Sequence, residues 1–164
     1  MYRRRVALVS VSAVACLSAA AVYVSADGAP ASGVAVPSPS AKAAALCDRL
    51  HDALPDRVDG LSVRSLSPVS TLTAGWGDPT VVLRCGVPRP ATLTPGSTTY
   101  NPTADAVDVN GVSWLMEQTG DGYRFTTTGR ATFVEVSVPA KYAPEVNPLA
   151  DLGNAVKKAI PSEL

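Results

Sequence analysis

The stretch WGDPTVVLRCG (residues 76–86) holds the densest set of side chains that could bind a ligand. It offers an aromatic face, a carboxylate and a guanidinium group, and a second tryptophan follows later in the chain: Trp76, Asp78, Arg84 and Trp114. An aromatic face can stack on a sugar and a guanidinium group can hold a carboxylate, so these four residues are a candidate ligand surface.

A structural interpretation of the same residues competes with the ligand surface. Gly-Asp-Pro is a turn sequence, so Asp78 would cap a turn and Trp76 would cover the edge of the core. We favour the structural interpretation.

Acid–base catalysis would have to use carboxylates or the single histidine. Two carboxylates about 5 to 9 Å apart across a cleft suit glycoside cleavage, and Asp78 could pair with Glu135 or with Asp108. His51 lies on the polar side of an expected helix, where a solvated side chain is the ordinary case. The sequence contains no nucleophile elbow, phosphate-binding loop, dinucleotide-binding motif, zinc-protease motif or calcium loop. We therefore expect no catalytic, cofactor-binding or metal-binding residue, and a hydrolase or transferase that uses paired carboxylates stays an alternative.

Cysteine chemistry depends on the compartment, and the N-terminus indicates export. Three arginines precede an uncharged run, VALVSVSAVACLSAAAVYV, at residues 6–24. As a helix this run would span about 28 Å, close to the hydrocarbon thickness of a bilayer, and arginines before it favour a cytoplasmic N-terminus. Three fates remain open for residues 1–26: an uncleaved transmembrane anchor, a signal peptide cut after Ala26, or a lipoprotein acylated at Cys16. Each of them exports the body of the protein.

An exported body leaves Cys47 and Cys85 as a pair in an oxidising compartment, and we predict a disulfide between them. The bond would close a loop of about 39 residues and contribute roughly 4 kcal/mol in the chain-entropy model. These two thiols lack the companion ligands of a zinc site, and neither belongs to a Cys-x-x-Cys redox motif.

Charge and composition divide the rest of the chain. Lys plus Arg equals Asp plus Glu at 14 each, but three of the basic residues lie in residues 1–26, which we call the leader. The remaining body is mildly acidic, which argues against nucleic-acid binding. Residues 27–40 are rich in Ala, Pro, Gly and Ser and are predicted to be a flexible linker. Residues 41–164 then form one extracytoplasmic domain.

Two helices are predicted at the ends of this domain. Ser40 is a suitable N-cap for a helix that ends near Pro55, with an apolar stripe at Ala43, Leu46, Cys47, Leu50 and Leu54. The stretch PLADLGNAVKKAI predicts a closing helix with its apolar stripe at Leu149, Leu152, Val156 and Ala159 or Ile160.

Strand patterns fill the region between the helices. Asn110-Gly111 is a strong hairpin signal that sets Val109 opposite Val112 and Val107 opposite Trp114. Further turns at TGDG and Thr128-Gly129 extend this hairpin into a four-stranded antiparallel meander over residues 106–138. One or two more strands are expected, at GLSVRSL and at PTVVLRCG, and residues 67–75 are expected to be a loop. The predicted fold class is α+β, a mostly antiparallel sheet with both helices packed on it.

Several blocks of the body resemble a known family. They are LCDRLHDALP, WGDPTVVLRCGVPRP, VNGVSWL, GRATFVEVSVPAKY and the late leucine-rich helix, behind an Ala-rich export segment. Over about residues 43–152 the chain resembles an actinobacterial family of exported proteins, domain of unknown function 3515. The resemblance implies a cell-envelope location in a high-GC Gram-positive bacterium, and it supplies no catalytic or binding residue.

The function expected from these observations is that of a non-catalytic binding or accessory domain outside the cytoplasm. Its N-terminal segment would attach it to the membrane, and its partner would be a cell-wall component or a membrane protein. Two alternatives remain. One is an envelope hydrolase or transferase that uses paired carboxylates. The other is a structural subunit of a membrane complex, and such a subunit would expose an apolar patch of more than a few hundred Å².

Overall fold

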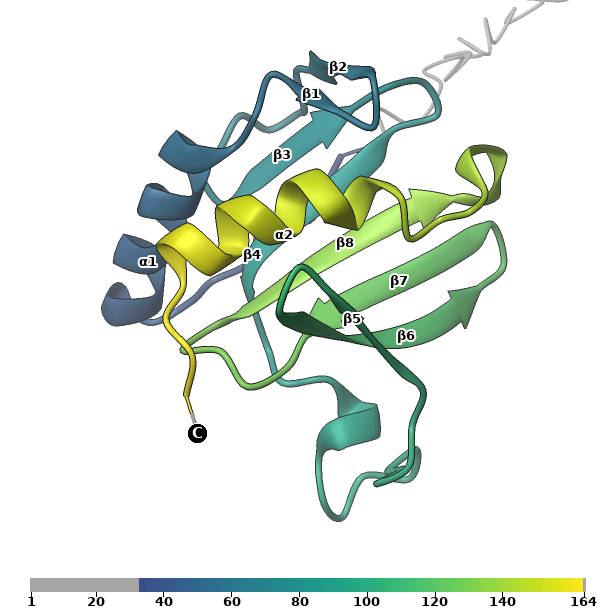
Figure 1. Ribbon diagram of the computed structural model, residues 1–164. Coiled ribbons are helices and arrows are strands. Elements are labelled where there is room, and N and C mark those ends of the chain that lie inside the picture. The colour runs from purple at the N-terminus through teal and green to yellow at the C-terminus, as the bar shows by residue number, and fades with distance from the viewer. Residues whose placement is uncertain (1–32, 164) are drawn as a thin grey trace, which may run out of the picture.

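The computed structural model describes residues 33–163, which fold around one antiparallel sheet (Figure 1). The helical elements are α1 (Ala41–Ala53), α2 (Pro148–Ala159) and two short 3-10 helices, η1 (Ala91–Leu93) and η2 (Ala140–Tyr142). The strands are β1 (Arg57–Val58), β2 (Leu61–Arg64), β3 (Thr73–Trp76), β4 (Val81–Val87), β5 (Ala106–Val109), β6 (Val112–Thr119), β7 (Gly122–Thr127) and β8 (Phe133–Pro139). The α+β class is confirmed.

The predicted number of strands is wrong: the sheet has eight strands in the order β1-β2-β3-β4-β8-β7-β6-β5. Strand β3 lies in a stretch that was expected to be a loop. Its sequence, Thr-Ala-Gly-Trp, has no alternating pattern that would predict a strand. Backbone pairing with β4, from Thr73↔Arg84 to Trp76↔Val81, holds these residues in a strand instead. The second unpredicted strand, β1, is a two-residue pairing with β2.

The meander of β5, β6, β7 and β8 is confirmed, including the register of its first hairpin. Val109 pairs with Val112 and Val107 with Trp114. Asn110 and Gly111 have φ values of 54° and 76°, which are favourable for this residue pair and disfavoured for most others. The turn chemistry therefore places every side chain of this hairpin on its face of the sheet.

Both helices cover the same face of the sheet and contact each other (Figure 1). The Ser40 side chain accepts a hydrogen bond from the backbone N–H of Ala43 at 3.3 Å, so the predicted N-cap is confirmed. The helices bury their apolar stripes against the inward-facing side chains of the strands, which include Trp76, Leu83, Trp114, Phe125, Val134 and Val136. This core occupies the space between the helices and one face of the sheet. Among residues 33–163, neither α1 nor α2 covers the opposite face, which we call the helix-free face.

The predicted disulfide is confirmed. Cys47 of α1 is bonded to Cys85 of β4, with the two Cα atoms 5.6 Å apart. It joins the first helix to a central strand of the sheet.

Residues 33–40, the end of the expected linker, have no helix or strand but lie against the sheet. The backbone N–H of Val34 donates to the Ser67 carbonyl at 3.0 Å. The Ala35 carbonyl accepts a hydrogen bond from Arg84 at 3.3 Å. The segment thus runs past β4 on the helix-free side before the chain enters α1 (Figure 1).

The leader lies outside the described residues, and with it the apolar run 6–24, the cleavage position after Ala26 and Cys16. Within residues 33–163, no helix has both the length and the apolar character needed to cross a bilayer.

Candidate functional site

Four charged side chains form a row across the helix-free face of the sheet: Arg84, Glu135, Arg124 and Glu117. We call them the ion-pair row. Each alternates along its strand with residues of the core, as Glu135 does between Val134 and Val136. Because successive side chains of a strand point to opposite faces, the same alternation that buries the valines turns the charged residues outward.

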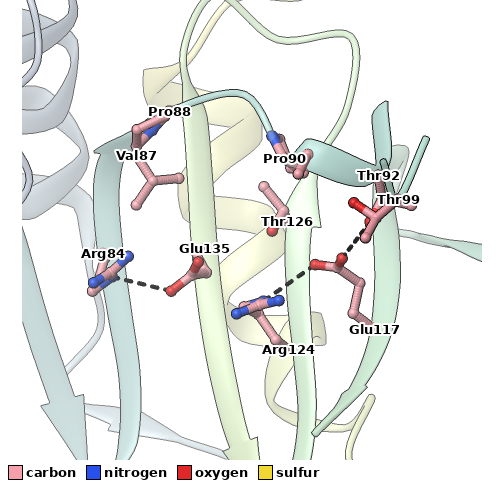
Figure 2. A pocket seen from close by; sticks show the side chains of 11 residues that line it. Arg84, Val87, Pro88, Pro90, Thr92, Thr99, Glu117, Arg124, Thr126 and Glu135 are labelled. Atoms are coloured by element: carbon pink, nitrogen blue, oxygen red, sulfur yellow. Dashed lines mark hydrogen bonds and ion pairs between the residues drawn. The ribbon is translucent and has the colours of Figure 1, made fainter. Parts of the chain in front are cut away.

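The register of neighbouring strands brings opposite charges together. Arg84 pairs across β4 and β8 with Glu135, and Arg124 pairs across β7 and β6 with Glu117. The Nε of Arg84 lies 3.0 Å from Oε1 of Glu135, and the Nε of Arg124 donates to Oε2 of Glu117 at 3.1 Å. Figure 2 shows the four side chains reaching toward one another from four adjacent strands. Opposite charges at directly paired positions stabilise the sheet.

The Arg84–Glu135 pair is the more buried of the two. Their side chains are 28% and 15% exposed, whereas Arg124 is 42% exposed. The Nε of Arg84 is buried, and its direction toward Glu135 does not satisfy the geometry of a hydrogen bond. Charge attraction therefore joins this pair, and the terminal nitrogen Nη1 is directed to the Ala35 carbonyl instead.

Two hollows meet at the ion-pair row, each with a volume of about 350 Å³. Both are lined by Arg84, Arg124 and Glu135. The first hollow continues under the loop that contains η1, where Pro88, Pro90, Thr92 and Thr99 form its wall (Figure 2). The second continues toward the other end of β8 and is lined there by Thr80, Val82, Thr119, Asp121, Ser137 and Pro139.

The loop is fixed to the row by a hydrogen bond. The Thr92 hydroxyl donates to Oε1 of Glu117 at 2.7 Å, while Oε2 of the same carboxylate holds Arg124. A carboxylate that accepts from a hydroxyl and a guanidinium group at once holds the wall of the first hollow in place.

The row keeps hydrogen-bonding capacity for a ligand. Among residues 33–163, the side-chain hydrogen bond of Arg124 uses its Nε and leaves its two terminal nitrogens without one. They can donate to a carbonyl or carboxylate in the fork geometry of a guanidinium group. Glu135 and the Thr99 hydroxyl can accept from a ligand's N–H or O–H groups. The arrangement can therefore bind a molecule that carries both acceptors and donors.

The four residues of the expected ligand surface do not come together. Trp76 and Trp114 are both 0% exposed, so neither indole can touch a ligand. Asp78 lies in the exposed turn between β3 and β4, where it faces Arg64 at 3.4 Å. Of the four, Arg84 alone lines the two hollows. The core position that the structural interpretation assigns to Trp76 is the one observed.

The carboxylate pairs considered for catalysis are also separate. Asp78 faces Arg64, Glu135 faces Arg84, and Oδ1 of Asp108 accepts from the Gly111 backbone within the first hairpin.

The carboxylate that shares the first hollow with Glu135 is Glu117, which sequence reasoning did not select. The register of the TGDG hairpin, which sets Glu117 opposite Arg124, was the available signal.

Within the described residues no three His, Cys, Asp or Glu side chains are grouped as metal ligands would be. His51, exposed on α1, lines a different and smaller hollow beside β2 and β3.

Comparison with known proteins places the chain. A family model described as "Protein of unknown function (DUF3515)" matches residues 6–164. The chain belongs to this family. No curated protein and no solved structure matches it. The DUF3515 match confirms the resemblance found in the sequence blocks, and the exported, actinobacterial character stays a prediction.

Proposed function

We propose that this DUF3515 protein is a non-catalytic binding or accessory domain of the cell envelope, held outside the cytoplasm by its N-terminal segment. The arginines and the apolar run 6–24 support export. The Cys47–Cys85 disulfide supports an oxidising compartment, because such bonds are rare where thiols are kept reduced.

The ligand surface of this proposal is the ion-pair row with its two hollows. The observation that carries it is that Arg84, Glu135 and Arg124 line both hollows at once. A ligand that crosses the row would therefore fill parts of both, which favours an elongated molecule lying along β8. Its acceptors would meet Arg124 and its donors would meet Glu135 and the threonines.

Each carboxylate of the ion-pair row is paired with an arginine, and this pairing favours ligand binding over acid–base chemistry. Glu135 and Glu117 each face an arginine at 3.0 and 3.1 Å. A carboxylate held in this way is suited to fixing the direction of a polar ligand. The same pairs give the row little net charge, so the ligand is expected to be polar with mixed charge and not strongly anionic.

Photo-crosslinking in intact cells tests the ligand surface. A crosslinking side chain at Thr99, in the first hollow, or at Ser137, in the second, should form adducts with a cell-wall or membrane component. The same side chain at Lys158, on the exposed side of α2, serves as the control and should form none. Arg124→Gln should lower the yield about tenfold, the factor expected for losing a hydrogen bond from a charged donor.

Arg64→Gln is the matched control for this substitution, because Arg64 also belongs to an exposed ion pair but lies outside both hollows. Equal adducts from position 158, or an equal loss with Arg64→Gln and Arg124→Gln, would contradict the proposed surface.

Location and the fate of the leader are tested together. Protease added to cells stripped of their wall should digest residues 41–164 while a cytoplasmic marker protein survives. Mass spectrometry of the mature protein then distinguishes an intact leader, cleavage after Ala26 and acylation at Cys16. A body that resists protease until the membrane is lysed would contradict export.

A further inference from the structure

A small apolar hollow lies beside β2 and the loop that follows it. Its volume is about 150 Å³, and its walls include Val63, Leu66 and Val69. Val63 is 60% exposed and Val69 is 91% exposed. Three large hydrophobic side chains are exposed in residues 33–163, and two of them are these valines; the third is Tyr100. Because both exposed valines line the same apolar hollow, they can meet one apolar partner together.

The size of this patch argues against a stable protein partner. A specific protein interface uses about 800 Å² on each side and roughly 20 to 30 residues. The patch offers two exposed valines, Val63 in β2 and Val69 in the loop that follows it. A lipid surface requires no matching shape, because the acyl-chain boundary accepts any apolar side chain that reaches it.

The path of the chain connects this patch to the leader. The backbone N–H of Val34 donates to the Ser67 carbonyl, so the first described residues lie against the loop that carries Val69. Eight residues separate Val24, the end of the apolar run, from Gly33. Even fully extended they span only about 30 Å. An N-terminal segment held in a bilayer would keep this loop within that distance of the lipid and raise its effective concentration there.

We propose that Val63, Val69 and the loop between them are a membrane-contact surface that rests on the outer side of the bilayer. The inference relies on the proposed attachment by the leader and adds an orientation to it. The end of the molecule with β1 and β2 faces the lipid, and the loop containing η1 lies at the opposite end (Figure 1). The first hollow, whose wall is that loop, then lies toward the end of the domain that is farther from the membrane.

Depth-dependent quenching on the full-length chain tests the surface. The chain, with Cys16→Ser to remove the third cysteine, is reconstituted into phosphatidylcholine–phosphatidylglycerol vesicles and labelled with an environment-sensitive dye at Val69→Cys. A dye buried ~5–10 Å into the headgroup boundary should shift to the blue and be quenched by spin-labelled lipid. The same dye at Thr98→Cys, in the exposed loop at the other end, should show at least about threefold less quenching at that depth.

A second set of variants tests the apolar contact itself. With the dye at Ser70→Cys, the double substitution Val63→Ser/Val69→Ser should reduce quenching to the level seen at position 98. Tyr100→Ser removes the other exposed apolar side chain and is the matched control, which should leave quenching at position 70 unchanged.

The outcomes separate the two proposals. Full-length chains with Cys16 intact, purified from the membranes of the native host, that fail to float with the vesicles would overturn the attachment by the leader and with it the inference. Chains that float but show equal quenching at positions 69 and 98 would overturn the membrane-contact surface alone.

Discussion

Trp76 and Trp114 are equally buried but differ in what their indole N–H groups contact. The Nε1 of Trp76 donates to the Pro55 carbonyl at 3.0 Å, so this side chain joins β3 to the residues that follow α1. The Nε1 of Trp114 is buried and has no hydrogen-bond partner among residues 33–163. A buried N–H group without a partner has lost its hydrogen bond to water and makes none within the protein. The two tryptophans should therefore contribute differently to the free energy of unfolding.

Phenylalanine substitutions measure that difference. Trp76→Phe removes a satisfied donor and leaves the Pro55 carbonyl without it, whereas Trp114→Phe removes an unsatisfied donor. Both lose a similar volume, so we expect Trp76→Phe to lower the free energy of unfolding by about 1 kcal/mol more than Trp114→Phe. Urea unfolding of both variants measures the difference. Equal losses would mean that volume alone decides, and that the hydrogen bond to Pro55 contributes nothing.

At the scale of elements, the segment 33–40 and strand β4 depend on each other at Gly86. This glycine has a φ of +83° and lies at the irregularity where β4 changes register against β8. A Cβ added to it would lie 2.7 Å from the Cβ of Pro39. The absence of a side chain therefore lets the segment pass close to the strand on the side of Arg84.

Gly86→Ala tests this close approach, and Gly96→Ala is its control. Gly96 has a φ of +87° but nothing within 4 Å of an added Cβ, so both variants share the conformational cost and only Gly86→Ala adds a clash. We expect Gly86→Ala to lower the free energy of unfolding by about 1–3 kcal/mol more than Gly96→Ala, the range for overpacking. Urea unfolding measures it, and limited proteolysis should cut residues 33–40 faster in Gly86→Ala. Indistinguishable variants would show that Pro39 moves aside without cost.

At the scale of the whole molecule, one covalent bond and one helix pair hold the core closed. The Cys47–Cys85 disulfide ties α1 to β4, and α1 packs on α2, which reaches the strands β5 and β6 at the far side of the sheet. The helix layer therefore spans the sheet while its other face carries the ion-pair row. The bond lies across a sequence separation of 38 residues, so its loss enlarges the unfolded ensemble.

Removing the bond should cost stability without changing the fold. Cys47→Ser/Cys85→Ser is expected to lower the free energy of unfolding by about 4 kcal/mol, the chain-entropy value for this loop. Cys16→Ser is the matched control and should leave the unfolding of the domain unchanged. Thermal and urea unfolding of the three proteins give the comparison. A loss below about 1 kcal/mol would show that α1 is held on the sheet by packing alone.

Local patterns of the sequence determined most of the elements of this protein. The Asn110-Gly111 turn determined a hairpin register to the residue, Ser40 determined where α1 begins, and the alternation in β8 determined which face Glu135 occupies. These features depend on backbone preferences and on side-chain periods of 2 and 3.6 residues, which a short stretch of sequence carries by itself.

Only the tertiary structure decided which elements became neighbours. Strand β3 exists because β4 pairs with it, and the pairing of β4 with β8 brings Arg84 to Glu135 across fifty intervening residues. The two-residue alternation of a strand sequence predicts which face of the sheet a side chain occupies. It does not predict which other strand pairs with that strand. For the same reason Trp76 and Trp114, chosen by residue type as ligand contacts, proved to be core, while Glu117 and Arg124 joined the site from the strands beyond β8.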